Sequence, residues 1–333
     1  QLIRAPGLNN FLVNGVLAGL GGVVVFVPQI ALLFFGLGIM ESSGFLARSA
    51  VLIDYPLSRL GLNGRSFVPL LSGFACAIPA ILATRVISNQ RVRLLTLMAI
   101  PLMQCSARLP VYGLLLGALF VSPLAGAIGL TAIYLGSILI AGIIVGIANR
   151  YTPSSNDNAS FIIELPAWQW PLWRQLLSQT LTKTSRFLLG AGPIIWGISL
   201  LIWFFAEVQF HGQPLIHTIG QWIEPIFKPM GVDWKVGVAI LLSFAAREVF
   251  VSALAIVYQV SEQALMGMST VNGLFNDTGA IIGLVLFFMV AMQCGATFAV
   301  LKKEMQQIKW PIILLVGYIA LAYVLAVLSN VIF

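Results

Sequence analysis

The chain has 333 residues, of which 59% are hydrophobic and only 9% are charged. Together with a mean hydropathy of +0.98, this composition excludes a soluble globular protein. The formal net charge of +7 does not indicate nucleic-acid binding, because basic residues in a membrane protein mostly report its orientation. We therefore predict an all-α polytopic membrane protein whose surroundings are the lipid bilayer. No signal peptide precedes the first apolar segment, so we expect a fragment or a processed product.

Four apolar segments follow one another in the first half of the chain: 5–40, 66–84, 94–120 and 124–148. The first and the last are long enough to span a hydrocarbon core, the first with a break expected near Pro28. The second is short and contains Pro69 and Pro79. We predict that it forms a re-entrant hairpin, because interrupted backbone at membrane depth needs protein or water around it. The third can cross, but Pro101 and the run 105–110 interrupt it.

The polar middle of the chain, residues 151–186, begins with a flexible linker and ends in a Trp-rich stretch. Tryptophan at this density is typical of a helix that lies at the membrane interface. We place this segment between two membrane repeats, residues 1–150 and 187–333.

The second half contains four more apolar segments: 187–205, 236–258, 279–301 and 310–331. Arg247 and Glu248 interrupt the second of these, whereas the other three are predicted to be spans. The polar connections 41–65 and 206–235 are predicted to lie outside the spans.

The distribution of basic residues predicts on which side of the membrane each connection lies. Most of the 18 Lys and Arg residues lie in four connections: 41–65, 85–93, 150–186 and 302–309. The connections 206–235 and 259–278 are net acidic. The positive-inside rule then places the basic connections in the cytoplasm and the acidic ones outside. The hairpin at 66–84 therefore enters from the cytoplasm and the segment at 236–258 from outside, which is an inverted-topology repeat.

An internal repeat supports the same conclusion. The sequence Met-Gln-Cys-x-Ala occurs at 103–107 and again at 292–296, and a Leu-Leu-Ser run precedes each copy. Paired polar interruptions in corresponding positions of two halves indicate a transport site.

The repeated motif supplies candidate metal ligands. Thiolates bind Fe²⁺, Cu⁺ and Zn²⁺ strongly, and a pseudo-two-fold axis would bring Cys105 and Cys294 to one central site. A free cysteine is, however, often a small buried hydrophobe, and Glu41 is also compatible with an ordinary carboxylate at a helix end. The candidate ligands are Cys76, Cys105, Cys294, Met103, Met292, Gln104, Gln293 and Glu41.

Other residues at membrane depth are predicted to have structural roles in the interrupted segments. There they would cap broken helices rather than contact the substrate. These are Ser72, Pro79, Ser106, Arg108, Ser243, Arg247 and Glu248. The sequence contains no phosphate-binding Gly-x-x-x-x-Gly-Lys-[Ser/Thr], no His-Glu-x-x-His and no Gly-x-Ser-x-Gly motif. We therefore predict no catalytic residues and a protein that is not an enzyme.

Several stretches resemble the membrane domain of the ferrous-iron transport protein B family. They follow one another in order over nearly the whole chain: 26–30, 41–48, 61–70, 73–85, 105–112, 164–166, 246–249 and 294–297. The most specific is the run Gly-Phe-Ala-Cys-Ala-Ile-Pro-Ala-Ile-Leu-Ala-Thr-Arg at 73–85. One departure is Arg247, where lysine is usual in the family.

The resemblance implies an Fe²⁺ importer of the bacterial inner membrane with two gate repeats, about 66–112 and about 236–303. It also implies that Cys76, Cys105 and Cys294 are candidates for the iron path. It also implies a cytoplasmic GTPase domain, which would bind GTP and Mg²⁺, and one further helix, both preceding Gln1. A small cytoplasmic accessory protein is a further expected partner, and nucleic acid is not. Two alternatives stay open at this point: a carrier of a small organic solute such as a nucleoside, and a membrane sensor that transports nothing.

Overall fold

The structure, a computed structural model, describes residues 18–120, 122–151, 168–207, 209–210, 213–244, 247, 249–258 and 277–332. These residues are helical apart from short connections and one antiparallel pair of two-residue strands, β1 (Gln209–Phe210) and β2 (Gln213–Pro214). Four stretches among them are long and apolar enough to cross a membrane, or five if one bent pair of helices counts as a span. The protein is therefore an all-α polytopic membrane protein, as predicted.

The chain forms two compact units. Unit 1 contains Gln1–Arg48 and Ile163–Ile219, and unit 2 contains Ser49–Ile162 and Gly220–Phe333. Unit 2 draws on both halves of the sequence, so the units do not coincide with the repeats 1–150 and 187–333 or with the linker 151–186. That division of the chain stays a prediction.

Two long helices make up most of unit 1, α2 (Ala18–Ser42) and α9 (Trp173–Glu207), and they pack along each other. The rings of Phe35 and Trp173 stack with their centroids 6.3 Å apart. The break expected at Pro28 is wrong, because α2 continues through this proline.

The structure also corrects the predicted polar segments. The separate interfacial helix expected within 151–186 is instead the first part of α9, which runs without interruption into the predicted span at 187–205. The connection 206–235 was expected to be a loop, but it contains β1, β2, α10 (Leu215–Phe227) and η6 (Lys228–Met230). The connection 41–65 likewise contains α3 (Phe45–Arg59) and η2 (Gly64–Ser66).

Both predicted hairpins of unit 2 are pairs of short helices. The first is α4 (Phe67–Ala75) and α5 (Ala77–Ala83), followed by η3 (Thr84–Val86), and the second is α11 (Trp234–Ser243) and α12 (Val249–Tyr258). The helices of each pair pack against each other.

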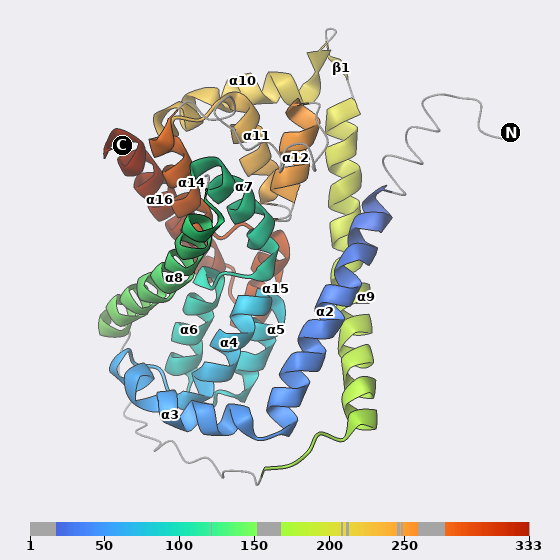
Figure 1. Ribbon diagram of the computed structural model, residues 1–333, viewed down its shortest axis with the longest axis vertical. Helices are drawn as coiled ribbons and strands as arrows, with labels where there is room; N and C mark the ends of the chain where they lie inside the picture. The colour runs from blue at the N-terminus through green and yellow to red at the C-terminus, as the bar shows by residue number, and fades with distance from the viewer. Residues whose placement is uncertain are drawn as a thin grey trace, which may run out of the picture. The chain divides into compact units, whose positions relative to one another are not determined.

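The two ends of each hairpin meet. Arg65 Nη1 lies 3.5 Å from Ser88 Oγ, and Lys235 Nζ lies 4.5 Å from the centroid of the Tyr258 ring. Figure 1 shows the two hairpins at opposite ends of unit 2. This arrangement is the one that an inverted-topology repeat requires, but the repeat itself stays a prediction.

Two crossings of unit 2 are broken at the copies of Met-Gln-Cys. The first consists of α6 (Gln90–Ala99), η4 (Ile100–Leu102), η5 (Ser106–Arg108) and α7 (Leu109–Leu119). The second consists of α14 (Thr278–Val290) and α15 (Gly295–Met305), which together are long and apolar enough to cross a membrane, so the span predicted at 279–301 is confirmed, with a break between its two helices. No proline lies in that break, and its carbonyl groups are satisfied by side chains from elsewhere in unit 2.

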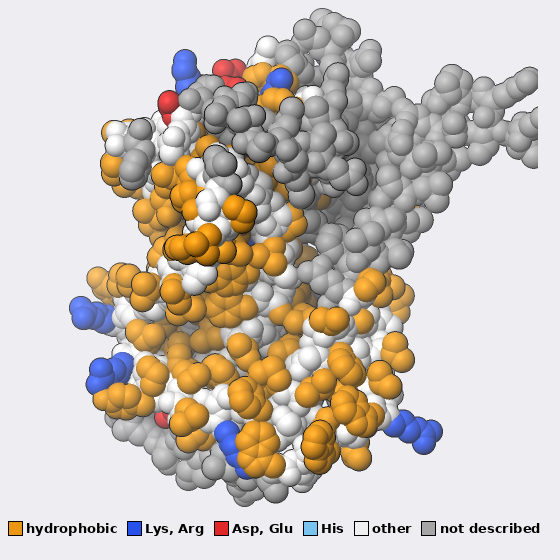
Figure 2. All heavy atoms as spheres, viewed as in Figure 1, with side chains coloured by type: hydrophobic (Ala, Val, Ile, Leu, Met, Phe, Trp, Pro, Cys, Tyr) orange, Lys and Arg blue, Asp and Glu red, His pale blue; other side chains and the backbone are white. Residues whose placement is uncertain are grey.

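Two unbroken helices flank these crossings, α8 (Pro123–Tyr151) and α16 (Lys309–Ile332). Leu124, Leu139 and Val331 are among the apolar side chains that they expose. On the face shown in Figure 2, hydrophobic side chains cover the middle of unit 2 between charged side chains above and below. This pattern is the one expected of a surface in contact with lipid.

Candidate functional site

Each of the three cysteines lies at a helix break in unit 2. Cys76 separates α4 from α5, Cys105 precedes η5, and Cys294 precedes α15. All three have extended backbones, with φ and ψ of −156° and 131°, −77° and 158°, and −161° and 106° respectively. Because an extended residue cannot continue the helical hydrogen-bond ladder, these breaks leave backbone polar groups available inside the unit.

The three thiols lie in one neighbourhood. Cys76 is within electrostatic range of Cys105, Cys294 and Arg247. Cys105 is buried, whereas Cys76 and Cys294 are half-buried. Among the described residues, however, no three His, Cys, Asp or Glu side chains lie close enough to hold one metal ion. The thiols are therefore neighbours that would have to move to share an ion.

Arg247 connects the break of the second hairpin to both copies of the motif. Its Nε donates to the Gln293 carbonyl oxygen at 2.8 Å, and its Nη1 donates to Cys105 Sγ at 3.4 Å. Its third nitrogen, Nη2, is buried with no partner in the part of the chain that the structure describes. The guanidinium thus lies where the thiol of one copy meets the backbone of the other.

Arg108 caps the broken end of α14. Its Nη1 donates to the Met289 carbonyl at 3.2 Å and its Nη2 to the Ala291 carbonyl at 3.0 Å. The side chain is fully buried. A backbone carbonyl without a partner is costly in an apolar interior, so these bonds explain how the chain tolerates a break at this depth.

The two glutamines of the repeated motif differ in their contacts. Gln104 donates from Nε2 to the carbonyls of Leu102 and Met289, at 3.1 and 2.9 Å, and its Oε1 accepts from Arg108 and Tyr112. Gln293 is equally buried, but neither amide atom has a hydrogen-bond partner among the described residues. Of the two, only Gln293 has an amide oxygen that is free to bind a substrate.

The methionines of the motif pack in the core. Met103 and Met292 are buried in the same hydrophobic cluster. A Cβ atom added at Gly73 would lie 3.0 Å from Met103 Cγ, so the first hairpin packs closely against this side chain.

Two of the remaining predicted residues, Ser243 and Ser106, donate to backbone carbonyls. Ser243 donates to the Ile240 carbonyl at 2.6 Å, and Ser106 donates to the Ala75 carbonyl at 3.4 Å, which links the first break to the first hairpin. Ser72 is buried and Pro79 is half-buried on the two helices of that hairpin. Glu248 lies outside the described residues.

Glu41 belongs to unit 1, whereas the three cysteines belong to unit 2. Its side chain is 70% exposed, and its carboxylate lies 3.9 Å from Lys183 Nζ. Its membership in the metal site stays a prediction.

Sequence reasoning missed two contributors. Tyr112 is fully buried and donates its hydroxyl to Gln104 Oε1; the spacing of Gln104, Arg108 and Tyr112 at intervals of four was a usable signal. Glu304 pairs with Arg85 and Arg93, and no local pattern indicates this pairing.

Two family models match the chain. The model described as Gate, nucleoside recognition, matches residues 23–119 and 188–308. The model described as the ferrous iron transport protein B C terminus matches residues 130–183. The two Gate segments contain all three cysteines and both copies of the motif.

Curated relatives cover nearly the whole chain. The Fe(2+) transporter FeoB of Leptospira biflexa is 41% identical over an alignment of 332 positions that covers 91% of this chain and 48% of the relative. That of Leptospira interrogans is 38% identical over an alignment of 353 positions, gaps included, that covers 95% of this chain and 50% of the relative. That of Staphylococcus aureus strain MSSA476 is 36% identical over an alignment of 327 positions that covers 96% of this chain and 48% of the relative. The chain thus spans about half the length of these relatives, and no solved structure matches it significantly.

Proposed function

Since this chain belongs to the ferrous-iron transport protein B family, as its C-terminal membrane region, we propose that it forms the path by which Fe²⁺ crosses a membrane. The observation that carries the proposal is the convergence of three thiols at three helix breaks in unit 2. The relatives named Fe(2+) transporter supply the identity of the ion.

The chemistry of the breaks suits a borderline metal cation. Thiolate sulfur binds Fe²⁺ strongly, and an amide oxygen can replace one of its water ligands. We assign Cys76, Cys105 and Cys294 as the sulfur ligands and the Gln293 amide as an oxygen ligand. Because the thiols do not form a metal site in this conformation, binding requires the breaks to approach one another, as expected for gated or alternating access.

Further parts of the proposal concern the full-length protein. A GTPase domain ahead of this chain would bind GTP with Mg²⁺ and control the gate, and the chain itself would catalyse no reaction. A small cytoplasmic protein would act with it, in the inner membrane of a bacterium. The relatives are about twice as long as this chain, which leaves room for such a domain.

The nucleoside-carrier alternative is not favoured. The description of the Gate model supports it, but relatives that are 36–41% identical and cover more than 90% of the chain are named as Fe²⁺ transporters. The sensor alternative differs in a measurable way, because a sensor would bind metal without net transport.

Anaerobic ⁵⁵Fe²⁺ uptake into proteoliposomes tests the proposal. Cys105→Ser and Cys294→Ser should each lower uptake by about tenfold or more, since a metal site that loses a ligand or its support loses affinity on this scale. Ser137→Ala is the matched control, because Ser137 is a buried residue of α8 whose hydroxyl bonds only within its own helix. The same variants in iron-starved cells, joined to the N-terminal half of a relative, test transport with a GTPase present.

Unchanged uptake in both cysteine variants would contradict the assignment of the thiols. If the unsubstituted chain takes up no iron in either setting, the transport proposal itself fails.

A further inference from the structure

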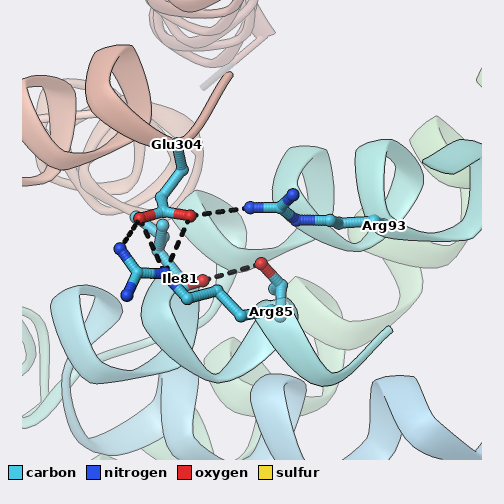
Figure 3. Close-up of polar contacts among 5 residues, drawn as sticks. Ile81, Arg85, Arg93 and Glu304 are labelled. Atoms are coloured by element: carbon cyan, nitrogen blue, oxygen red, sulfur yellow. Dashed lines mark hydrogen bonds and ion pairs between the residues drawn. The ribbon is translucent and has the colours of Figure 1, made fainter. Parts of the chain in front are cut away.

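Glu304 joins two arginines from distant parts of unit 2. Its Oε1 accepts from Arg85 Nε and Nη2 at 3.0 and 2.5 Å, and its Oε2 accepts from Arg93 Nη2 at 2.7 Å. Figure 3 shows the two guanidinium groups on either side of the carboxylate. The Glu304 side chain is only 5% exposed, whereas those of Arg85 and Arg93 are 58% and 29% exposed. We call this group the Glu304 clasp.

The clasp lies at the far ends of two helices that begin at cysteines. Cys76 immediately precedes α5, and Arg85 lies in η3 directly after that helix. Cys294 immediately precedes α15, and Glu304 lies in its last turn. Helices α5 and α15 pack against each other. The clasp therefore joins one end of a helix pair whose other end carries two of the three thiols.

The electrostatics favour a persistent clasp. A carboxylate that accepts several charge-assisted bonds from two arginines makes a strong and directional interaction. Because Glu304 is nearly buried, loss of the arginines would leave its charge poorly solvated, which is costly. Arg93 also ties the pair to α6, which leads into the break at Cys105.

We propose that Glu304 is a positioning residue that holds α5 against α15 and thereby sets the separation of the Cys76 and Cys294 thiols. The inference deepens the proposed function, because these two thiols are among the ligands assigned to Fe²⁺. An α-helix behaves as a rigid rod over three turns, so displacement of its last turn also displaces its first. Opening of the clasp would then change the geometry of the thiol pair.

Cross-linking measures that geometry without iron. In a Cys105→Ser background only Cys76 and Cys294 remain, and short bis-maleimides of graded length can join them within one chain. Mass spectrometry of the linked peptides gives the rate for each length. Glu304→Gln should slow the reaction with the best linker by about tenfold, in line with the coupling energies of contacting residues. Glu224→Gln is the control, because Glu224 forms no ion pair among the described residues.

A double-mutant cycle separates positioning from general stability. Arg85→Gln should slow cross-linking less than Glu304→Gln, and the double variant should be no slower than Glu304→Gln alone. If Glu304→Gln does not fold, the variant Arg85→Gln with Arg93→Gln replaces it, because it removes both partners of the carboxylate, and it should slow cross-linking by a similar factor. An unchanged rate in folded Glu304→Gln, or in the folded double arginine variant, would overturn the inference.

The outcome is independent of the transport proposal. A clasp that controls the thiol pair in a chain without Fe²⁺ uptake would leave the positioning role intact and remove the proposed function. If the unsubstituted chain takes up Fe²⁺ but Glu304→Gln leaves the cross-linking rate unchanged, the proposed function stands and the positioning role of Glu304 is excluded.

Discussion

At the scale of single residues, Gln104 and Gln293 occupy the same place in the two copies of Met-Gln-Cys but differ in their bonding. Gln104 is held by Arg108, Tyr112 and two backbone carbonyls, whereas the Gln293 amide has no partner among the described residues. A buried amide without partners reduces stability unless something else binds it. From this difference we propose a scaffold role for Gln104 and a substrate role for Gln293.

Replacement of each glutamine by leucine tests that assignment. Gln104→Leu should lower the free energy of unfolding by about 2–3 kcal/mol, because it removes the buried hydrogen bonds that Arg108, Tyr112 and two backbone carbonyls make with the Gln104 amide. Gln293→Leu should change it by less than about 0.5 kcal/mol, or raise it, because no hydrogen bond is lost. Thermal unfolding of the purified protein in detergent measures both. Equal destabilisation by the two substitutions would show that Gln293 has partners of its own.

The Gln293→Leu variant also shows whether an effect on Fe²⁺ uptake is independent of an effect on stability. Gln293→Leu should lower Fe²⁺ uptake by about tenfold while its unfolding temperature stays near that of the unsubstituted chain, because a metal ligand is removed and no structural bond is broken. Uptake is compared at equal amounts of folded protein in the liposomes. Full uptake by this variant would exclude the Gln293 amide from the iron path.

At the scale of elements, α14 and α16 are held together by close approach of their backbones. A Cβ atom added at Gly283 would lie 2.9 Å from the Ala326 carbonyl oxygen and 3.4 Å from its Cα. Small residues allow membrane helices to pack at such distances, where dispersion and weak hydrogen bonds supply the stability. This contact anchors the first part of the broken crossing to an unbroken helix.

The close contact at Gly283 can be tested by comparing an alanine substitution there with one at a glycine that has no neighbouring atoms. Gly283→Ala should destabilise the protein by about 1–3 kcal/mol, because the added methyl group forces two backbones apart. Gly317→Ala, in α16, is the matched control, because nothing lies within 4 Å of its added Cβ. That change should be neutral or stabilising by up to about 1 kcal/mol, as alanine favours helix. A Gly283→Ala protein that unfolds at the temperature of Gly317→Ala would contradict the close contact.

At the scale of the whole molecule, the open question is how the hairpins enter the bilayer. The ends of the first hairpin meet through Arg65 and Ser88, and those of the second meet through Lys235 and Tyr258. Ends that meet are expected of re-entrant segments, since a full crossing separates its ends by about 30 Å. The charge bias of the connections then predicts which side each hairpin faces.

Labelling of single cysteines tests this topology. In a chain with all three native cysteines replaced by serine, Ser58→Cys and Ser88→Cys should react with an impermeant maleimide only from the cytoplasmic side. Lys228→Cys should react only from outside, because it lies in the net acidic connection 206–235. All three positions are exposed. Labelling of Ser58→Cys and Ser88→Cys from opposite sides would mean that 66–84 crosses the membrane.

Local features of the sequence were enough to predict the class of protein, the broken hairpins and the two intact spans at α8 and α16. Hydropathy, proline and the density of basic residues act within a few residues of their position, so they can be read along the chain. Polar groups at membrane depth also marked the cysteines and arginines of the site, because such groups are costly in lipid.

Only the tertiary structure could show which distant groups bond to one another. The groups that stabilise the break before Cys294 could not be predicted, because a carbonyl that it frees, that of Ala291, accepts from Arg108, which is 183 residues away. Gln104 and Gln293 both lie in a Met-Gln-Cys sequence, so only the residues around them in space distinguish their hydrogen bonding. The pairing of Glu304 with Arg85 spans 219 residues. Such contacts depend on the path of the whole chain, and no local pattern of hydropathy or charge encodes them.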